Sequence, residues 1–356
     1  MPSDISPVAG VADPGTPASA TPATSARQPR RLSTWLRRIA GLLITALIFL
    51  WMFKPIYAHW AGVRDRIDQI DWREALLASA MFAVFLFVFR VQSWRFILRG
   101  LGARLPLAPA TRIWSASELA RYLPGVIWQV VGRVYLVRPY GISGSVCSAS
   151  QVLELILFLL ANVLMAVACL TWFGFKHLHD AALGWFIGVA AIAPVLLVLL
   201  HPRVFYGLLN RVLKKFGKPA ISQRLPKRQL SALLAWAMLG LFWQSLAIWL
   251  VTHTALHLHL AKWWVVAGAY CLAWCAGFLA VWAPGGLGVR ELVFMTALSA
   301  GLPPAVRSQF NDPKVLLGFL AFLSVLLRLW ATVGELMLAS AAAIADMRGW
   351  LGVKPR

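Results

Sequence analysis

The chain has 356 residues, of which 60% are hydrophobic and 13% are charged, and its mean hydropathy is +0.71. Soluble globular proteins have about 25% charged residues, so this chain has too little polar surface to cover a core of its own size in water. The net charge of +21 comes from Lys and Arg in short segments between apolar stretches, a distribution that sets membrane orientation and does not favour nucleic acid as a partner. The composition predicts an all-α, polytopic membrane protein.

The N-terminal segment divides into a polar tail and a first span. Residues 1–30 are rich in Ala, Pro, Ser and Thr and show no apolar period, which predicts a disordered tail over 1–34. The apolar stretch 39–53 follows five arginines with no acid nearby. Because cationic segments stay in the cytoplasm, the N-terminus is expected there, in a bacterial inner membrane.

Further apolar stretches follow the first one along the chain. A helix needs about 20 residues to cross ~30 Å of hydrocarbon. The predicted spans are 39–53, 75–98, 146–173, 183–200, 229–252, 263–282 and 313–342. If 286–302 also crosses, the count rises from seven to eight. The segment 201–229 has eight basic residues and no acid, which predicts a cytoplasmic loop, and 346–356 is a short basic tail.

Two apolar segments, 112–140 and 281–302, are interrupted by Pro-Gly and carry charges. Non-helical backbone at membrane depth persists only where protein or water covers its polar groups. Each segment is therefore expected to be a broken or re-entrant helix lining a cavity, with Pro124 and Pro284 close together. Their similarity raises a possible internal repeat, an arrangement that many transporters have.

Charged residues inside the spans need an explanation, because each costs roughly 2.5–3.5 kcal/mol on insertion scales. For Arg90 we expect the side chain to reach the cytoplasmic interface. Two polar stripes lie at helical spacing: Gln151, Glu154 and Asn162, and Ser324, Arg328, Thr332 and Glu335. Such stripes either bond to one another between helices or form a polar path for a lipid head group, and the spacing leaves both open.

The stretch VWAPGGLGVRELVF, residues 281–294, has three glycines that permit φ > 0 and close backbone approach: Gly285, Gly286 and Gly288. A helix that begins at about Val289 would direct free N–H groups toward this loop, where an anion can bind. Arg290 adds a bidentate phosphate donor. The alternative is a tight reversal in which Arg290 pairs with Glu291 or Glu335.

The side chains that most often carry enzyme chemistry form no known pattern in this sequence. There is no Ser/His/Asp order and no His–Glu metalloprotease spacing, so the chain is more plausibly a non-enzyme, and no cofactor or metal is predicted. Cys271 and Cys275 share one helical face, where packing is a better explanation than metal binding.

Three motifs are similar to those of the flippase-like membrane family, also called the lysylphosphatidylglycerol synthase transmembrane region. They are PGGLGVRE at 284–291, RYLPGVIWQVVGR at 121–133 and YGIS at 140–143. The resemblance covers roughly 35–345 and implies a bundle of about eight spans that handles a charged or glycosylated lipid.

By matching motif, the resemblance carries over Pro284, Gly285, Gly286, Gly288, Arg290 and Glu291, together with Arg121, Pro124, Gly125, Gly132, Arg133 and Glu154. The family often has Arg and a later Asp after this last glutamate, where this chain has Leu155 and Phe158. No aminoacyl-transfer domain is expected, because the sequence ends near residue 356.

These observations predict a protein that translocates or presents an anionic phospholipid or a lipid-linked glycan. The predicted lipid and anion ligands are Gly285, Gly286, Gly288, Arg290, Glu291, Arg121, Arg133, Glu154, Arg328 and Glu335. The alternatives are a membrane-embedded transferase that uses Glu291 and Glu335, and a non-catalytic subunit of an envelope-lipid pathway.

Overall fold

The computed structural model describes most of the chain beyond the first predicted span. The described residues are 71–120, 127–173, 187–215, 217, 220–221, 223–256, 262–280, 283, 286–308, 310 and 313–347. The predicted tails at 1–34 and 346–356 lie wholly or almost wholly outside this part, and the span at 39–53 lies outside it entirely.

The described part is built from helices, and no strand occurs in it, which confirms the predicted all-α class. The helices are α3 (Trp72–Val84), η1 (Phe85–Val91), α4 (Gln92–Gly100), α5 (Leu107–Leu119), α6 (Ile127–Val137), η3 (Arg138–Tyr140), α7 (Gly144–Phe173), α9 (Ile192–Leu200), α10 (Pro202–Lys215), α11 (Lys227–Leu256), α12 (Trp263–Leu279), α13 (Val289–Gly301), α14 (Pro304–Arg307) and α15 (Pro313–Met347).

Four helical stretches in the described part are long and apolar enough to cross a membrane: Trp72–Gly100, Gly144–Cys169, Lys227–His253 and Lys314–Ala345. They correspond to the predicted spans 75–98, 146–173, 229–252 and 313–342. A bent pair, formed by Ile187–Leu200 and Pro202–Lys215 with 77° between them, raises the number to five. The predicted total of seven or eight is therefore not confirmed.

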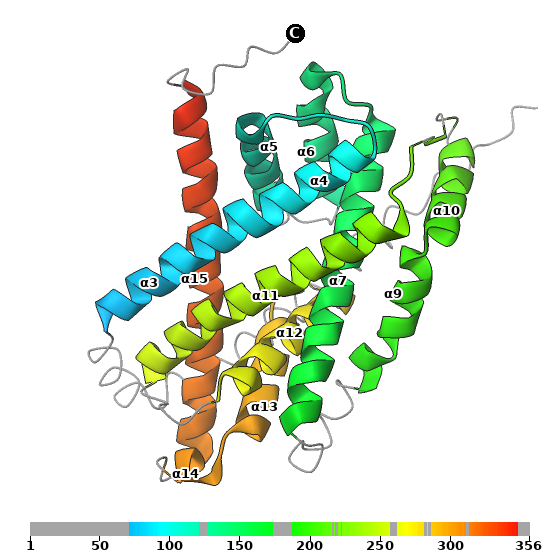
Figure 1. Ribbon diagram of the computed structural model, residues 1–356. Helices are drawn as coiled ribbons and strands as arrows, with labels where there is room; N and C mark the ends of the chain where they lie inside the picture. The colour runs from blue at the N-terminus through cyan, green and yellow to red at the C-terminus, as the bar shows by residue number, and fades with distance from the viewer. Residues whose placement is uncertain are drawn as a thin grey trace, which may run out of the picture.

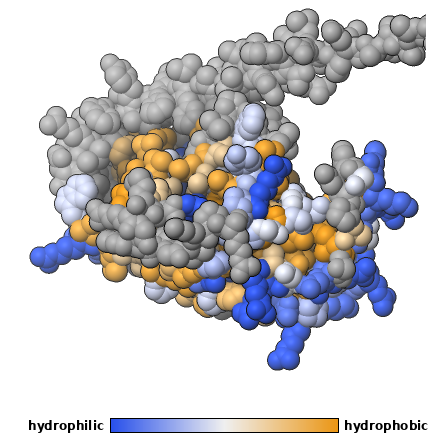
Figure 2. All heavy atoms as spheres, turned by 90° about the horizontal axis from the view of Figure 1, so that it is seen from above, coloured by the Kyte–Doolittle hydropathy of each residue, from blue (hydrophilic) through white to orange (hydrophobic). Residues whose placement is uncertain are grey.

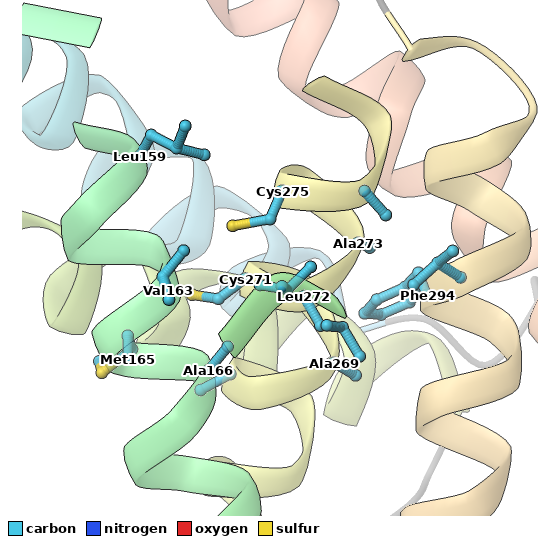
Figure 3. Packing of buried hydrophobic residues seen from close by; sticks show 14 of the residues in the cluster. Leu159, Val163, Met165, Ala166, Ala269, Cys271, Leu272, Ala273, Cys275 and Phe294 are labelled. Atoms are coloured by element: carbon cyan, nitrogen blue, oxygen red, sulfur yellow. The ribbon is translucent and has the colours of Figure 1, made fainter. Parts of the chain in front are cut away.

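The centre of the bundle lies where α12 packs against α7 on one side and α13 on the other (Figure 1). Figure 3 shows Cys271 and Cys275 of α12 directed toward α7, among apolar side chains such as Val163. Phe294 of α13 approaches α12 from another side. This dry environment supports the packing role predicted for the two cysteines.

The α3–η1–α4 rod and α11 lie side by side and run antiparallel (Figure 1). At one end, Glu74 lies 3.4 Å from His253. At the other end Gly100 approaches Leu225, so closely that an added Cβ would lie 2.6 Å from that side chain. The end of α4 and the start of α11 therefore lie at the same end of the bundle. This agrees with the prediction that both adjoin the cytoplasmic side.

Short helices lie beside both Pro-Gly interruptions. In 112–140, α5 packs against α6; in 281–302, α13 follows the interruption and packs against α12, which precedes the segment. At about 1.5 Å per residue, the 13 residues of α5 extend only about 20 Å, less than the ~30 Å of a bilayer core. The predicted broken helix in 112–140 is thus two short helices that meet before either could cross.

The outer surface of the bundle is apolar. Large hydrophobic side chains are exposed on the helices that form the periphery, among them Leu76, Val195, Leu239, Leu329 and Met337. Hydrophobic residues occupy much of the face in Figure 2, and hydrophilic ones project mainly from its edges. Such a surface is compatible with lipid, because acyl chains make no demand for hydrogen bonds.

Candidate functional site

A cavity of about 760 Å³, partly open to the surroundings, lies where seven elements of the bundle meet. The elements are the α3–η1 rod, α5, α7, α11, α12, α13 and α15. Six ionisable residues line it: Arg90, Arg290, Arg328, Glu118, Glu291 and Glu335. Four of these were predicted as ligands: Arg290, Arg328, Glu291 and Glu335. The fold therefore brings predicted ligands of α13 and α15 to one cavity.

Arg290 lies in the first turn of α13, and its side chain is only partly buried in the cavity wall. Its Nη2 donates a hydrogen bond to the hydroxyl of Tyr270 at 2.9 Å, and the guanidinium lies 5.2 Å from the centre of that ring. Among the described residues it forms no ion pair. The alternative, a pairing with Glu291 or Glu335, is thus absent there, and most of its N–H groups are available to a ligand.

Helix α13 begins at Val289, at the residue where its start was predicted. The N–H of Gly288 donates to Oε2 of Glu291 at 2.7 Å. A carboxylate of the chain therefore occupies the N-terminal position at which an external anion was expected. This contact gives Glu291 a role in holding the helix start, next to the arginine that remains accessible.

Two of the glycines before α13 have positive φ, 70° for Gly286 and 84° for Gly288. The first of them crosses Gly277 of α12 so closely that a Cβ at Gly286 would lie 2.6 Å from the carbonyl oxygen of Gly277. Only glycine allows this crossing, which fixes α13 against the end of α12 and places Arg290 beside the cavity.

The predicted polar stripe of α15 faces the cavity, with Ser324, Arg328 and Glu335 in its wall. Thr332 is not part of this lining; it donates to the carbonyl oxygen of Arg328, as Ser324 does to that of Leu320. Three of the four members of the stripe therefore border the cavity.

Arg133 is the centre of a buried ion cluster next to the cavity. Its Nη1 donates to Glu154 at 2.8 Å, its Nη2 to Glu118 at 2.9 Å and its Nε to the hydroxyl of Ser117 at 2.8 Å. The indole of Trp114 donates to Glu154 at 3.1 Å. All three guanidinium nitrogens are thus bonded within the protein, so the cluster joins α5, α6 and α7 as a rigid framework.

Arg90 corrects one sequence prediction. It was expected to extend to the cytoplasmic interface, but its guanidinium lies inside the bundle, 3.4 Å from Glu154 and 3.9 Å from the centre of the Phe158 ring. It belongs to the π-helical turn η1, Phe85–Val91. The carboxylate and the aromatic ring hold the arginine inside, where an isolated helix would have directed it to the lipid interface.

Several predicted residues lie outside the described part: Arg121, Pro124, Gly125, Pro284 and Gly285. The predicted approach of the two Pro-Gly breaks is therefore not tested directly. Residues beside the breaks do converge, because Glu118 and Arg290 line the same cavity.

The sequence analysis missed Glu118 and Tyr270. Glu118 is an acid within 112–140, a segment already expected to enter the membrane. A charged residue in such a segment is a candidate functional residue, so its charge could have identified it. Tyr270 gave no signal, because tyrosine is common in apolar helices and its contact with Arg290 spans 20 positions.

The comparisons with known proteins give one family. The family described as "Lysylphosphatidylglycerol synthase TM region" matches residues 38–306. No curated protein matches the chain.

Proposed function

The chain belongs to the lysylphosphatidylglycerol synthase transmembrane-region family, and we propose that it translocates an anionic phospholipid or a lipid-linked glycan across the membrane. The proposed binding site is the central cavity, with Arg290 as the ligand of the head-group phosphate. The family supports a membrane protein that acts on lipids; the particular lipid and its movement belong to the proposal.

The observation that carries the proposal is the position of Arg290. A cation at membrane depth is normally neutralised by a nearby carboxylate, whereas this guanidinium forms one hydrogen bond, to Tyr270, and no ion pair among the described residues. A phosphate would supply the missing charge and accept two parallel N–H bonds. Glu291 already fixes the start of the helix, so binding requires no rearrangement there.

The rest of the lining suits a lipid. Aromatic and aliphatic side chains from several helices surround the charged groups, among them Phe82, Phe85, Phe158, Trp274 and Leu327. Binding sites for small molecules combine such apolar walls with a few converging polar groups. This cavity has that kind of lining and is partly open, so a head group can approach the arginines while its acyl chains extend into lipid.

The transferase alternative retains one supporting observation. Its only acid–base candidates, Glu291 and Glu335, do line the same cavity. Glu291, however, accepts the Gly288 N–H at 2.7 Å, so one of its carboxylate oxygens is already engaged in holding the start of α13. Translocation therefore remains the better supported function.

The function is tested by translocation in reconstituted vesicles. Head-group-labelled phosphatidylglycerol is placed in both leaflets, and an impermeant quencher is added outside, with and without a pH gradient across the membrane. Vesicles with the protein should lose label from both leaflets, whereas protein-free vesicles should lose only the outer fraction. If the two preparations stay alike with and without the gradient, translocation of this lipid is contradicted.

Filling the cavity should block translocation. Ala331 lines the cavity on α15, and we expect Ala331→Phe to place a ring where the head group passes. The translocation rate should fall at least about tenfold, which corresponds to a barrier higher by about 1.4 kcal/mol. The control is Ala168→Phe, at an exposed position of α7. Equal rates for the two variants at equal folded fractions would exclude this cavity as the route.

We further propose that the protein resides in a bacterial inner membrane and that the end of the bundle bearing α10 is cytoplasmic. The helix carries Arg203, Arg211, Lys214 and Lys215 and no acid, the pattern of cytoplasmic segments. In a variant lacking the four native cysteines, Lys215→Cys should resist an impermeant maleimide in intact spheroplasts, while Arg73→Cys, at the other end of the bundle, should react. The opposite result would invert the orientation.

A further inference from the structure

The arginine of the π-helical turn, Arg90, occupies an unusual position between two cavities. It lines the central cavity together with Arg290, and it also lines a second, smaller cavity beside Glu154 and Ser93. Its side chain is 15% exposed. A residue that borders both spaces can reach a ligand in one of them from a resting position near the other.

The contact between Arg90 and Glu154 is the weakest of those that this carboxylate makes. Arg133 donates to the carboxylate at 2.8 Å and Trp114 at 3.1 Å, whereas Nη2 of Arg90 lies 3.4 Å away. Charge-assisted hydrogen bonds from guanidinium groups are shorter, about 2.7–2.9 Å. Glu154 therefore keeps two hydrogen-bond donors without Arg90, one of them the guanidinium that it shares with Glu118.

The guanidinium of Arg90 makes no hydrogen bond to the other described residues. Its main support is the face of Phe158, 3.9 Å below it, with the ring of Trp114 at 5.5 Å. Stacking on an aromatic face leaves the in-plane N–H groups unused. A guanidinium that is mostly buried and lacks acceptors for its donors favours an incoming anion.

We propose that Arg90 is a second phosphate ligand of the central cavity, held in reserve by Glu154 and released to the head group when a lipid binds beside Arg290. This inference rests on the proposed function and adds to it a specific exchange of partners. When Arg90 leaves, Glu154 keeps its hydrogen bonds from Arg133 and Trp114, so this carboxylate is not left without donors. The phosphate then lies between arginines of two different elements, η1 and α13.

Binding of dioctanoyl phosphatidylglycerol to the purified protein in detergent tests the exchange, with dioctanoylglycerol as the phosphate-free reference. Arg90→Gln should weaken phosphatidylglycerol binding about tenfold, the effect of one charge-assisted hydrogen bond. Arg90→Lys should restore part of the affinity. The melting temperature of Arg90→Gln should stay within about 3 °C of the wild-type value, because the ion cluster survives.

Glu154→Gln distinguishes a reserve ligand from a merely nearby charge. It should strengthen phosphatidylglycerol binding about three- to tenfold by releasing Arg90, and this gain should vanish in the Arg90→Gln background. If Glu154→Gln strengthens binding equally in the wild-type protein and in Arg90→Gln, the gain comes only from the removal of a negative charge near the cavity, and the exchange is wrong. Unchanged affinity in Arg90→Gln would also overturn it.

The controls separate this inference from the function on which it rests. If the wild-type protein binds phosphatidylglycerol no better than dioctanoylglycerol, the proposed function itself fails. If the preference exists and requires Arg290 but not Arg90, the proposed function stands and only the exchange is wrong.

Discussion

Replacing Arg133 with alanine is expected to destabilise the protein by about 3–5 kcal/mol, the usual effect of removing one partner from a buried ion pair. The arginine side chain is 1% exposed, and those of Glu118 and Glu154 are 4% and 7% exposed. Its removal takes the shared guanidinium from both carboxylates; Glu118 keeps the side chain of Gln129, and Glu154 keeps Arg90 and Trp114. Thermal unfolding in detergent measures the loss.

The matched control is Arg138→Ala, which removes an exposed arginine just beyond the same helix. Surface substitutions of this kind usually change stability by no more than about 0.5 kcal/mol. Adding Glu118→Gln to Arg133→Ala should recover part of the loss, because one stranded charge disappears. Equal melting temperatures for Arg133→Ala and Arg138→Ala would show that the ion cluster does not hold α5, α6 and α7 together.

Replacing Arg290 with alanine is expected to lower the translocation of phosphatidylglycerol at least about tenfold while leaving the fold largely intact. The side chain donates one hydrogen bond within the described part of the protein, to Tyr270, and such a bond contributes only about 1 kcal/mol. A phosphate bound by the guanidinium would lose both charge and bidentate geometry. Arg290→Lys keeps the charge without the planar fork and should be partly active.

The control for Arg290 is Arg203→Ala, which removes an exposed arginine of α10. Its translocation rate should equal that of the wild-type protein. A phosphate ligand and a structural residue predict opposite outcomes for Arg290→Ala. If this variant melts far earlier while its folded fraction translocates normally, the arginine is structural.

Local sequence signals were sufficient to predict the start of α13 and the polar face of α15. Glycines that permit a positive φ, as Gly286 and Gly288 have in the structure, precede Val289, and the spacing of Ser324, Arg328 and Glu335 places them on one face of a helix. These features depend on the nearest turns of the chain. The structure places the three α15 residues beside Arg290 in the wall of one cavity.

The partners of the charged residues could not be predicted in the same way. Arg133 lies 15 positions from Glu118 and 21 from Glu154, and the periodicity of one helix does not show which neighbour it meets. Arg90 lies in a span that is apolar on every side, so no polar face indicated its direction. Its π-helical turn, which the sequence pattern did not reveal, belongs to the wall of the cavity.

Glu291 illustrates a different limit. Its place in the first turn of α13 fitted both an anion site and an internal helix cap. In the structure Glu291 caps the helix, because it accepts a hydrogen bond from the Gly288 N–H at 2.7 Å. The path of the preceding loop decides between the two roles, and the sequence alone does not show that path. The sequence also left two roles open for Arg290, and its hydrogen bond to Tyr270 of α12 depends on how α12 packs against α13.

The recognition of a lipid phosphate by Arg290 is tested most directly by the affinities of the wild-type protein and Arg290→Ala for dioctanoyl phosphatidylglycerol and dioctanoylglycerol. The two lipids share their acyl chains, so their difference isolates the phosphoglycerol head group. The wild-type protein should prefer phosphatidylglycerol at least about tenfold, the effect of one charge-assisted contact, and Arg290→Ala should lose this preference while remaining folded. An equal preference in folded Arg290→Ala would contradict the assignment of the phosphate to this arginine.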